Sequence, residues 1–175
     1  NKDINGDGYA DAVMGANAYN TNQGRVYIFY SAGSSGIATA SAASANAIVT
    51  GVAINNNFGY SPTLGDVNGD GFADLVVGAI WYNSSQGRAY IFHSAGTSGI
   101  STISAGSADT ILTGEATNNS FGQSLALGDV NYDGYADLAV GGHDYNTGQG
   151  RAYIFHSAGS SGIATVAAGS ANSIL

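Results

Sequence analysis

Three short segments of the chain gather most of its acidic residues at a fixed spacing. They span residues 3–11, 66–74 and 129–137, and each follows the pattern D-x-N-x-D-G-x-x-D. In such a tight loop the side chains at positions 1, 3 and 5 project inward, Gly at position 6 permits the turn, and position 7 offers its carbonyl. This arrangement of oxygen donors is typical of a Ca²⁺ site. The predicted ligands, including a carboxylate at position 9 that closes each site, are Asp3, Asn5, Asp7, Tyr9 and Asp11; Asp66, Asn68, Asp70, Phe72 and Asp74; and Asp129, Asn131, Asp133, Tyr135 and Asp137.

The distribution of charge supports three calcium sites. The chain has 12 Asp and Glu residues, and only Asp109, Glu115 and Asp144 lie outside the loops. Three divalent ions would change the formal net charge from −8 to −2. The alternative is a set of Asx-rich hairpin turns without metal, which would not require the same carboxylates in every loop. EF-hands are excluded, because their position 12 is Glu and here it is Met or Val.

The loops belong to a longer repeat with a period of 63 residues, since Arg25, Arg88 and Arg151 keep the same spacing. Repetition on this scale indicates a propeller, solenoid or array. Each unit reads as short β-branched and aromatic runs separated by Gly, Asn and Ser. The predicted strands are 58–65 and 121–128; 11–16, 74–79 and 137–142; 88–93; and 110–113. The Ser/Ala/Gly stretches at 31–45, 94–108 and 157–171 are interpreted as connections rather than helices, because Gly recurs within them.

The repeat resembles the FG-GAP repeat. The resemblance rests on Phe58-Gly59 and Phe121-Gly122, on Gly15-Ala16 and Gly78-Ala79, and on the loop between the first two strands. It implies an all-β fold of four-stranded antiparallel propeller blades, as in the seven-bladed ring of integrin α subunits and many bacterial surface proteins. The sequence departs from the pattern in the third unit, where Gly141-Gly142 replaces Gly-Ala and Tyr132 replaces a loop Gly at a position not expected to face the metal.

Composition narrows the classes of function. Charged residues make up 9% of the chain, against about 25% in ordinary globular proteins. The chain has no Cys, four Lys and Arg residues, and no apolar run long enough to cross a bilayer. We therefore expect an extracellular or cell-surface protein that binds no nucleic acid and does not insert into membranes. No G-x-S-x-G or other catalytic constellation occurs, which favours a non-catalytic module.

A ligand is expected on the face opposite the calcium loops. In an up-and-down blade, the loop between the second and third strands and the connection from the fourth strand to the next first strand share that face. Integrin-like propellers bind ligands there. Residues in these segments include some that differ between the repeats, as binding residues would. The predicted ligand-binding residues, for a protein or a glycan, are Trp81, Tyr82, Asn83, Glu115, His143 and Asp144. Trp81 as a half-buried rim residue is the alternative.

Residues 1–175 are interpreted as one partial propeller domain with repeats at about 1–57, 58–120 and 121–175. The first unit lacks its first strand, which leaves eleven strands, or about 2.75 blades, where rings have about four to eight. We expect neighbouring blades from a longer parent chain or from other copies. Two functions remain open: an adhesin or lectin-like module, and a self-assembling subunit of a surface layer or filament.

Overall fold

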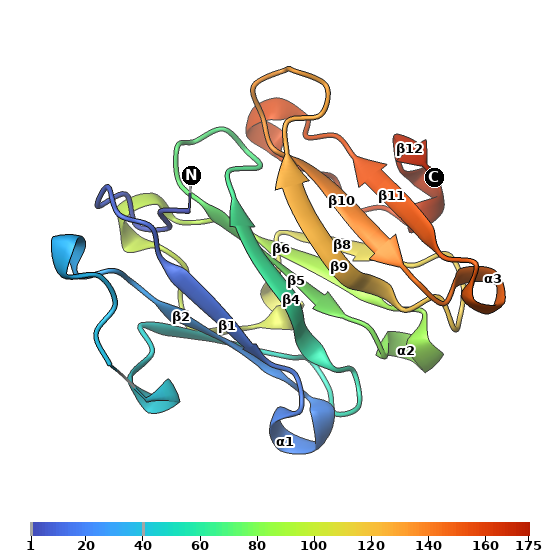
Figure 1. The fold of residues 1–175 in the computed structure, drawn as a ribbon, viewed down its shortest axis with the longest axis horizontal. Coiled ribbons are helices and arrows are strands. Elements are labelled where there is room, and N and C mark those ends of the chain that lie inside the picture. The colour runs from blue at the N-terminus through green and yellow to red at the C-terminus, as the bar shows by residue number, and fades with distance from the viewer. Residues whose placement is uncertain (1, 40) are drawn as a thin grey trace.

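A computed structural model describes residues 2–39 and 41–175; positions 1 and 40, at the start of the first repeat and within the first Ser/Ala/Gly stretch, lie outside the described residues. The described residues form three four-stranded β-sheets placed side by side (Figure 1). The strands are β1 (Ala12–Ala16), β2 (Arg25–Phe29), β3 (Ala47–Thr50), β4 (Phe58–Gly65), β5 (Asp74–Ala79), β6 (Arg88–Phe92), β7 (Ile103–Ser104), β8 (Thr110–Thr113), β9 (Phe121–Gly128), β10 (Asp137–Gly142), β11 (Arg151–Phe155) and β12 (Ser173–Ile174).

The second and third sheets are the antiparallel blades that the sequence predicts. Their strand orders are β4-β5-β6-β8 and β9-β10-β11-β12, so that each of these two sheets is built from four strands of one repeat. The predicted bounds of β4, β5, β8, β9 and β10 are confirmed. The third strand ends one residue earlier than predicted, because the N–H of His93 donates to the Asp109 side chain instead of a strand carbonyl (2.7 Å).

The first sheet differs from the other two. It contains β1, β2 and β3 of the first repeat, and its fourth strand is β7, which belongs to the second repeat. Strand β7 pairs parallel to β3, with Val49 opposite Ile103. The second Ser/Ala/Gly connection therefore crosses to the preceding blade and adds a strand to it, a pairing that the sequence does not predict.

Short helical turns occupy the connections. The turns α1, α2 and α3 each follow the second strand of a blade and contain residues with positive φ, among them Asn20, Asn83 and Asn146. The 3₁₀ turns lie in the Ser/Ala/Gly stretches, which are connections as predicted. The bounds are α1 (Tyr19–Asn22), α2 (Tyr82–Ser85), α3 (Tyr145–Gly148), η1 (Gly33–Ser35), η2 (Ala42–Ser44), η3 (Gly96–Ser98), η4 (Ala105–Ser107), η5 (Gly159–Ser161) and η6 (Ala168–Ser170). Among the described residues, none of these helices has the length and apolar character needed to cross a membrane.

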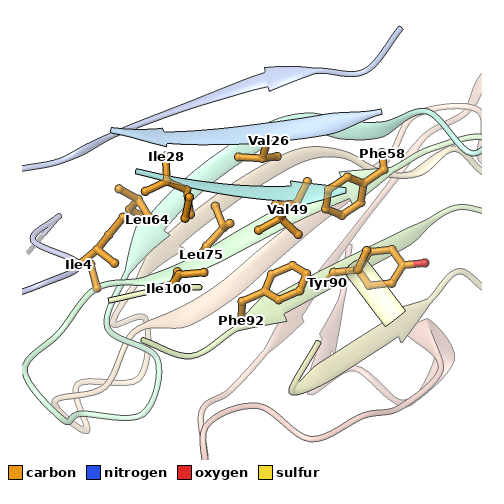
Figure 2. Close-up of a cluster of buried hydrophobic side chains, with 14 of the residues drawn as sticks. Ile4, Val26, Ile28, Val49, Phe58, Leu64, Leu75, Tyr90, Phe92 and Ile100 are labelled. Atoms are coloured by element: carbon orange, nitrogen blue, oxygen red, sulfur yellow. The ribbon is translucent and has the colours of Figure 1, made fainter. Parts of the chain in front are cut away.

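The hydrophobic core lies between the blades. Alternate side chains of neighbouring sheets face each other, so that Val26 and Ile28 of the first blade and Phe92 of the second belong to one buried cluster (Figure 2). Phe58 completes it with edge-to-face contacts to Tyr90 and Phe92, at centroid separations of 5.6 and 6.4 Å. An equivalent cluster, with Phe121 against Tyr153 and Phe155, fills the second junction. Because each blade buries its apolar faces against its neighbours, the blades form one continuous body.

The Phe-Gly and Gly-Ala motifs meet at the junctions. A Cβ atom placed on Gly15 would lie 1.9 Å from the carbonyl oxygen of Gly59, and one on Gly78 would lie 2.0 Å from that of Gly122. Gly59 and Gly122 themselves have positive φ. Two backbones can approach this closely only where neither carries a side chain. The motifs therefore allow the second strand of one blade to pack closely against the first strand of the next blade.

Candidate functional site

The three acidic loops lie at one end of the blades, and α1, α2 and α3 lie at the other (Figure 1). Each loop leads into the second strand of its blade: residues 3–11 precede β1, residues 66–73 join β4 to β5, and residues 129–136 join β9 to β10. The predicted calcium ligands and the predicted ligand-binding residues are therefore on opposite ends of the molecule.

The aspartate at position 1 organises each loop. In the second loop, Asp66 Oδ1 accepts hydrogen bonds from the N–H groups of Gly69 (2.6 Å) and Asp70 (3.2 Å), and Asp66 Oδ2 accepts one from Gly71 (2.9 Å). Asp3 makes the same three bonds within its own loop. Asp129 accepts from two loop N–H groups, at 2.9 and 3.1 Å. The chain thus wraps around this carboxylate in every repeat.

Positions 3 and 5 face one another across the turn. In the second loop, Asn68 Oδ1 accepts from the N–H of Asp70 (3.0 Å), and Asn68 Nδ2 donates to Asp70 Oδ2 (3.1 Å). Asp70 Oδ1 in turn accepts from the N–H of Phe72 (2.9 Å). The first and third loops have the same bonds. The hydrogen bonds expected of Asx turns are therefore present, and the oxygen donors at positions 1, 3 and 5 lie within one small loop.

The aspartate at position 9 connects the loop to the end of the third strand. Asp74 is fully buried; its Oδ2 accepts from the N–H of Val67 and its Oδ1 from the N–H of Ser94, both at 2.9 Å. Asp11 and Asp137 make the equivalent pairs of bonds. Burial raises the pKa of the Asp74 carboxyl to about 6, against the lowering effect of the two N–H donors. Each position-9 carboxylate therefore has a structural role, which the spacing of the loop residues does not reveal.

The donor chemistry of the loops fits a hard cation. Carboxylate oxygens have lone pairs beyond those that accept the N–H groups, and amide and peptide oxygens complete the set that Ca²⁺ prefers. Within residues 2–39 and 41–175, however, no three carboxylate or imidazole side chains converge as a ready-made metal cluster. A bound ion would therefore depend on the Asn side chain and the position-7 carbonyl as well as on the carboxylates.

On the opposite face, the repeated Arg and Tyr residues form stacked pairs. The guanidinium carbons of Arg25, Arg88 and Arg151 lie 3.9, 3.6 and 3.7 Å from the ring centroids of Tyr19, Tyr82 and Tyr145. In the same turns Asn83 Nδ2 donates to Gln86 Oε1 (2.7 Å), as the equivalent Asn residues do in the other blades. Tyr82 and Asn83 thus share a framework that occurs in every blade.

The remaining predicted ligand-binding residues divide between two blade junctions. Trp81 immediately precedes α2 and is 44% exposed. Glu115 accepts hydrogen bonds from Arg151 Nη1 (2.8 Å) and from the Tyr153 hydroxyl (3.2 Å). These contacts place Glu115 in a network with the third blade. Trp81 lies between the first and second blades, where its backbone N–H donates to the carbonyl oxygen of Asn56 (3.2 Å).

A hollow of about 660 Å³ lies beside α3, between the second and third blades. Asp144 lines it and is held by the Ser120 hydroxyl (2.6 Å) and by His143 Nε2, 3.0 Å from its second oxygen. The sequence predicts the segments that line the hollow but not most of the individual lining residues. Their short amide and hydroxyl side chains resemble those of ordinary turn residues. The lining residues are Ser85, Ala116, Thr117, Asn118, Asn119, Asp144, Tyr145, Asn146, Thr147 and Gly148.

Comparisons with known proteins agree with this architecture. The FG-GAP repeat matches residues 3–29, 58–92 and 121–155. The chain is 39% identical to integrin alpha-PS2 of Drosophila melanogaster over 118 residues, which are 62% of this chain and 8% of that protein. It is 37% identical to human integrin alpha-7 over 117 residues (62% and 9%) and 40% identical to mouse integrin alpha-IIb over 109 residues (56% and 10%). The aligned segment is about a tenth of the length of these relatives. With three matched repeats and three propeller-like blades, the chain belongs to the FG-GAP repeat family.

Proposed function

We propose that the chain is a non-catalytic, calcium-binding module of an extracellular β-propeller that acts in adhesion. The observation that carries the calcium part is the threefold recurrence of one loop geometry. In each loop the oxygen atoms of positions 1, 3 and 5 surround the same turn, at the end of the blades opposite α1, α2 and α3 (Figure 1). An Asx turn can use Asn as well as Asp, whereas every loop has a carboxylate at positions 1, 5 and 9.

The ligands proposed for each ion are the side chains at positions 1, 3, 5 and 9 and the carbonyl at position 7. In the second loop these are Asp66, Asn68, Asp70, Asp74 and Phe72. A calcium ion there would neutralise the loop carboxylates, including Asp74, whose burial disfavours its charged form. The affinity should lie near ~10⁻⁴–10⁻³ M, as in other extracellular modules, or somewhat tighter.

Thermal unfolding tests this proposal. An ion that binds only the folded chain stabilises it by about 2.7 kcal/mol per site at 100 times Kd. Excess chelator should therefore lower Tm, and Asp70→Ala should reproduce part of the loss. The change Asp109→Ala serves as a carboxylate control, since Asp109 lies outside the loops and caps the end of β6. Its effect on Tm should be the same with and without calcium. Identical melting curves in calcium and in chelator would contradict calcium binding.

The adhesion part rests on similarity to integrin alpha chains and on the surface opposite the loops. The hollow beside α3 presents hydroxyls, amides and the carboxylate of Asp144, and the indole of Trp81 is exposed at the preceding junction. Polar hydrogen-bonding groups and an exposed aromatic side chain on the same face suit a protein or glycan ligand. We therefore place ligand contact on this face.

Binding to a glycan array and to cell surfaces tests the choice of face. The change Thr147→Ala removes a hydroxyl from the hollow, and Trp81→Ala removes the exposed indole. Both should weaken binding while the shift of Tm by calcium stays the same. Lys2→Ala, an exposed change at the loop end, should leave binding intact. If binding is instead lost on Lys2→Ala and is unaffected by the other two changes, the ligand does not bind the face that carries Thr147 and Trp81.

A further inference from the structure

In the second and third loops, the aromatic ring at position 7 packs against the loop of the preceding blade. A Cβ atom placed on Gly6, at position 4 of the first loop, would lie 2.3 Å from Phe72 Cε1. One placed on Gly69, at position 4 of the second loop, would lie 2.2 Å from Tyr135 Cε1. Real Cβ atoms do not approach a ring so closely, so the ring can take this place only because position 4 is Gly.

The third loop has Tyr132 at position 4. Its φ is +61°, close to the +74° of Gly6 and the +71° of Gly69. Because the backbone has the same left-handed conformation, the Cβ of Tyr132 points in the direction of the Cβ atoms built on those glycines. That conformation is unfavourable for a residue with a side chain, and the Tyr132 side chain is 94% exposed. A following blade packed like the second and third would place its position-7 ring on this side chain.

The outer face of the third blade, on the side of Tyr132, keeps the features of a blade junction. Ile4 and Val67, at position 2 of the first two loops, are fully buried by the next blade, whereas Val130 is 53% exposed. The carbonyl oxygens of Ile4 and Val67 accept hydrogen bonds from the hydroxyls of Ser94 and Ser157 on the next blade, both at 2.6 Å. The third blade repeats this backbone and its apolar side chains. Its outer face therefore continues the interface that occurs twice within the chain.

We propose that the open face of the third blade binds a β-sheet blade that lacks an aromatic side chain at loop position 7, and that Tyr132 selects such a partner by occupying the place of the ring. A second copy of this chain joined head to tail does not fit, because its first loop would bring Tyr9 onto Tyr132. Tyr9 is itself 44% exposed where a preceding blade would cover it. The inference depends on packing alone and does not require that calcium or a ligand is bound.

The junction between the second and third blades offers a direct test, since Gly69→Tyr recreates the third loop opposite Tyr135. We expect Gly69→Tyr to lower Tm by about 10 °C, and Tyr135→Ala, which keeps the position-7 carbonyl, to lower it less. The double variant should recover about half of the loss caused by Gly69→Tyr. If Gly69→Tyr does not fold, Gly69→Ala with and without Tyr135→Ala gives the same comparison. Additive losses, or no loss on changing Gly69, would overturn the proposal.

Sedimentation of the full chain tests whether a second copy is the occupant. Tyr132→Gly should tighten self-association at least tenfold relative to the unchanged chain. Adding Ile37→Glu, on the face of the first blade that a copy would cover, should reverse this gain. Ile37 is the counterpart of Ile100, which is buried in the first junction. Equal self-association of the unchanged chain and Tyr132→Gly would show that Tyr132 does not exclude a second copy, and would overturn this part of the proposal.

Discussion

The position-9 aspartate of the second loop offers the sharpest separation of structural from metal-binding roles. Asp74→Ala removes the acceptor of two N–H groups, those of Val67 and Ser94, at a fully buried position. A buried donor left without a partner costs about 1–3 kcal/mol, so the loss of both acceptor contacts should cost about 2–6 kcal/mol. At about 2–4 °C per kcal/mol for a chain of this size, Tm should fall by about 10 °C.

The matched variant is Asp70→Ala, which removes a carboxylate from an exposed part of the same loop. In excess chelator this change should cost less than about 1 kcal/mol, whereas Asp74→Ala should retain its full cost. In calcium, both variants should also lose the stabilisation of one ion. Urea unfolding of the two variants with calcium and with chelator measures these four values. Equal losses for Asp70→Ala and Asp74→Ala in chelator would refute the structural role of Asp74.

Three further predictions concern the core, the titration of the loops and the ligand face. Gly78→Ala would place a Cβ 2.0 Å from the Gly122 carbonyl oxygen, and it should cost about 3 kcal/mol or more in urea unfolding. The control Gly71→Ala has open space around its Cβ and should cost only the strain of its positive φ. Because burial raises the pKa of Asp74 to about 6, protons compete with calcium below that pH, so calcium affinity measured by calorimetry should fall between pH 7 and pH 5; a constant affinity would contradict the participation of Asp74. Asp144→Asn should weaken ligand binding in a surface-binding assay without changing the shift of Tm by calcium, and unchanged binding would remove Asp144 from the site.

The sequence predicts the strands well because each unit repeats the same apolar alternation. Strands β4, β5 and β9 begin and end where the pattern places them, since each is long and half or fully buried in a junction. Strand β7 escapes prediction because its two residues have no alternation to detect. It forms only when the second connection lies along β3 of the preceding blade.

The sequence predicts which residues form the candidate site, but it does not predict the structural contacts that these residues make. The loop pattern identifies the carboxylates, yet one of the two partners of Asp74 is the N–H of Ser94, 20 residues away after the end of β6. Such a contact requires the folded blade. The role proposed for Tyr132 is hidden for the same reason, because its equivalents Gly6 and Gly69 contact rings from the next repeat. The effect of a residue in one repeat therefore depends on its contacts with the neighbouring repeat.

Native mass spectrometry of the 175-residue chain tests the central claim most directly. We predict three calcium ions per folded chain, all lost on addition of chelator, and two ions in the Asp70→Ala variant. The masses count the sites independently of stability or ligand binding. A chain that carries no calcium at millimolar free ion, or an Asp70→Ala variant that still carries three, would contradict the assignment of one site to each loop.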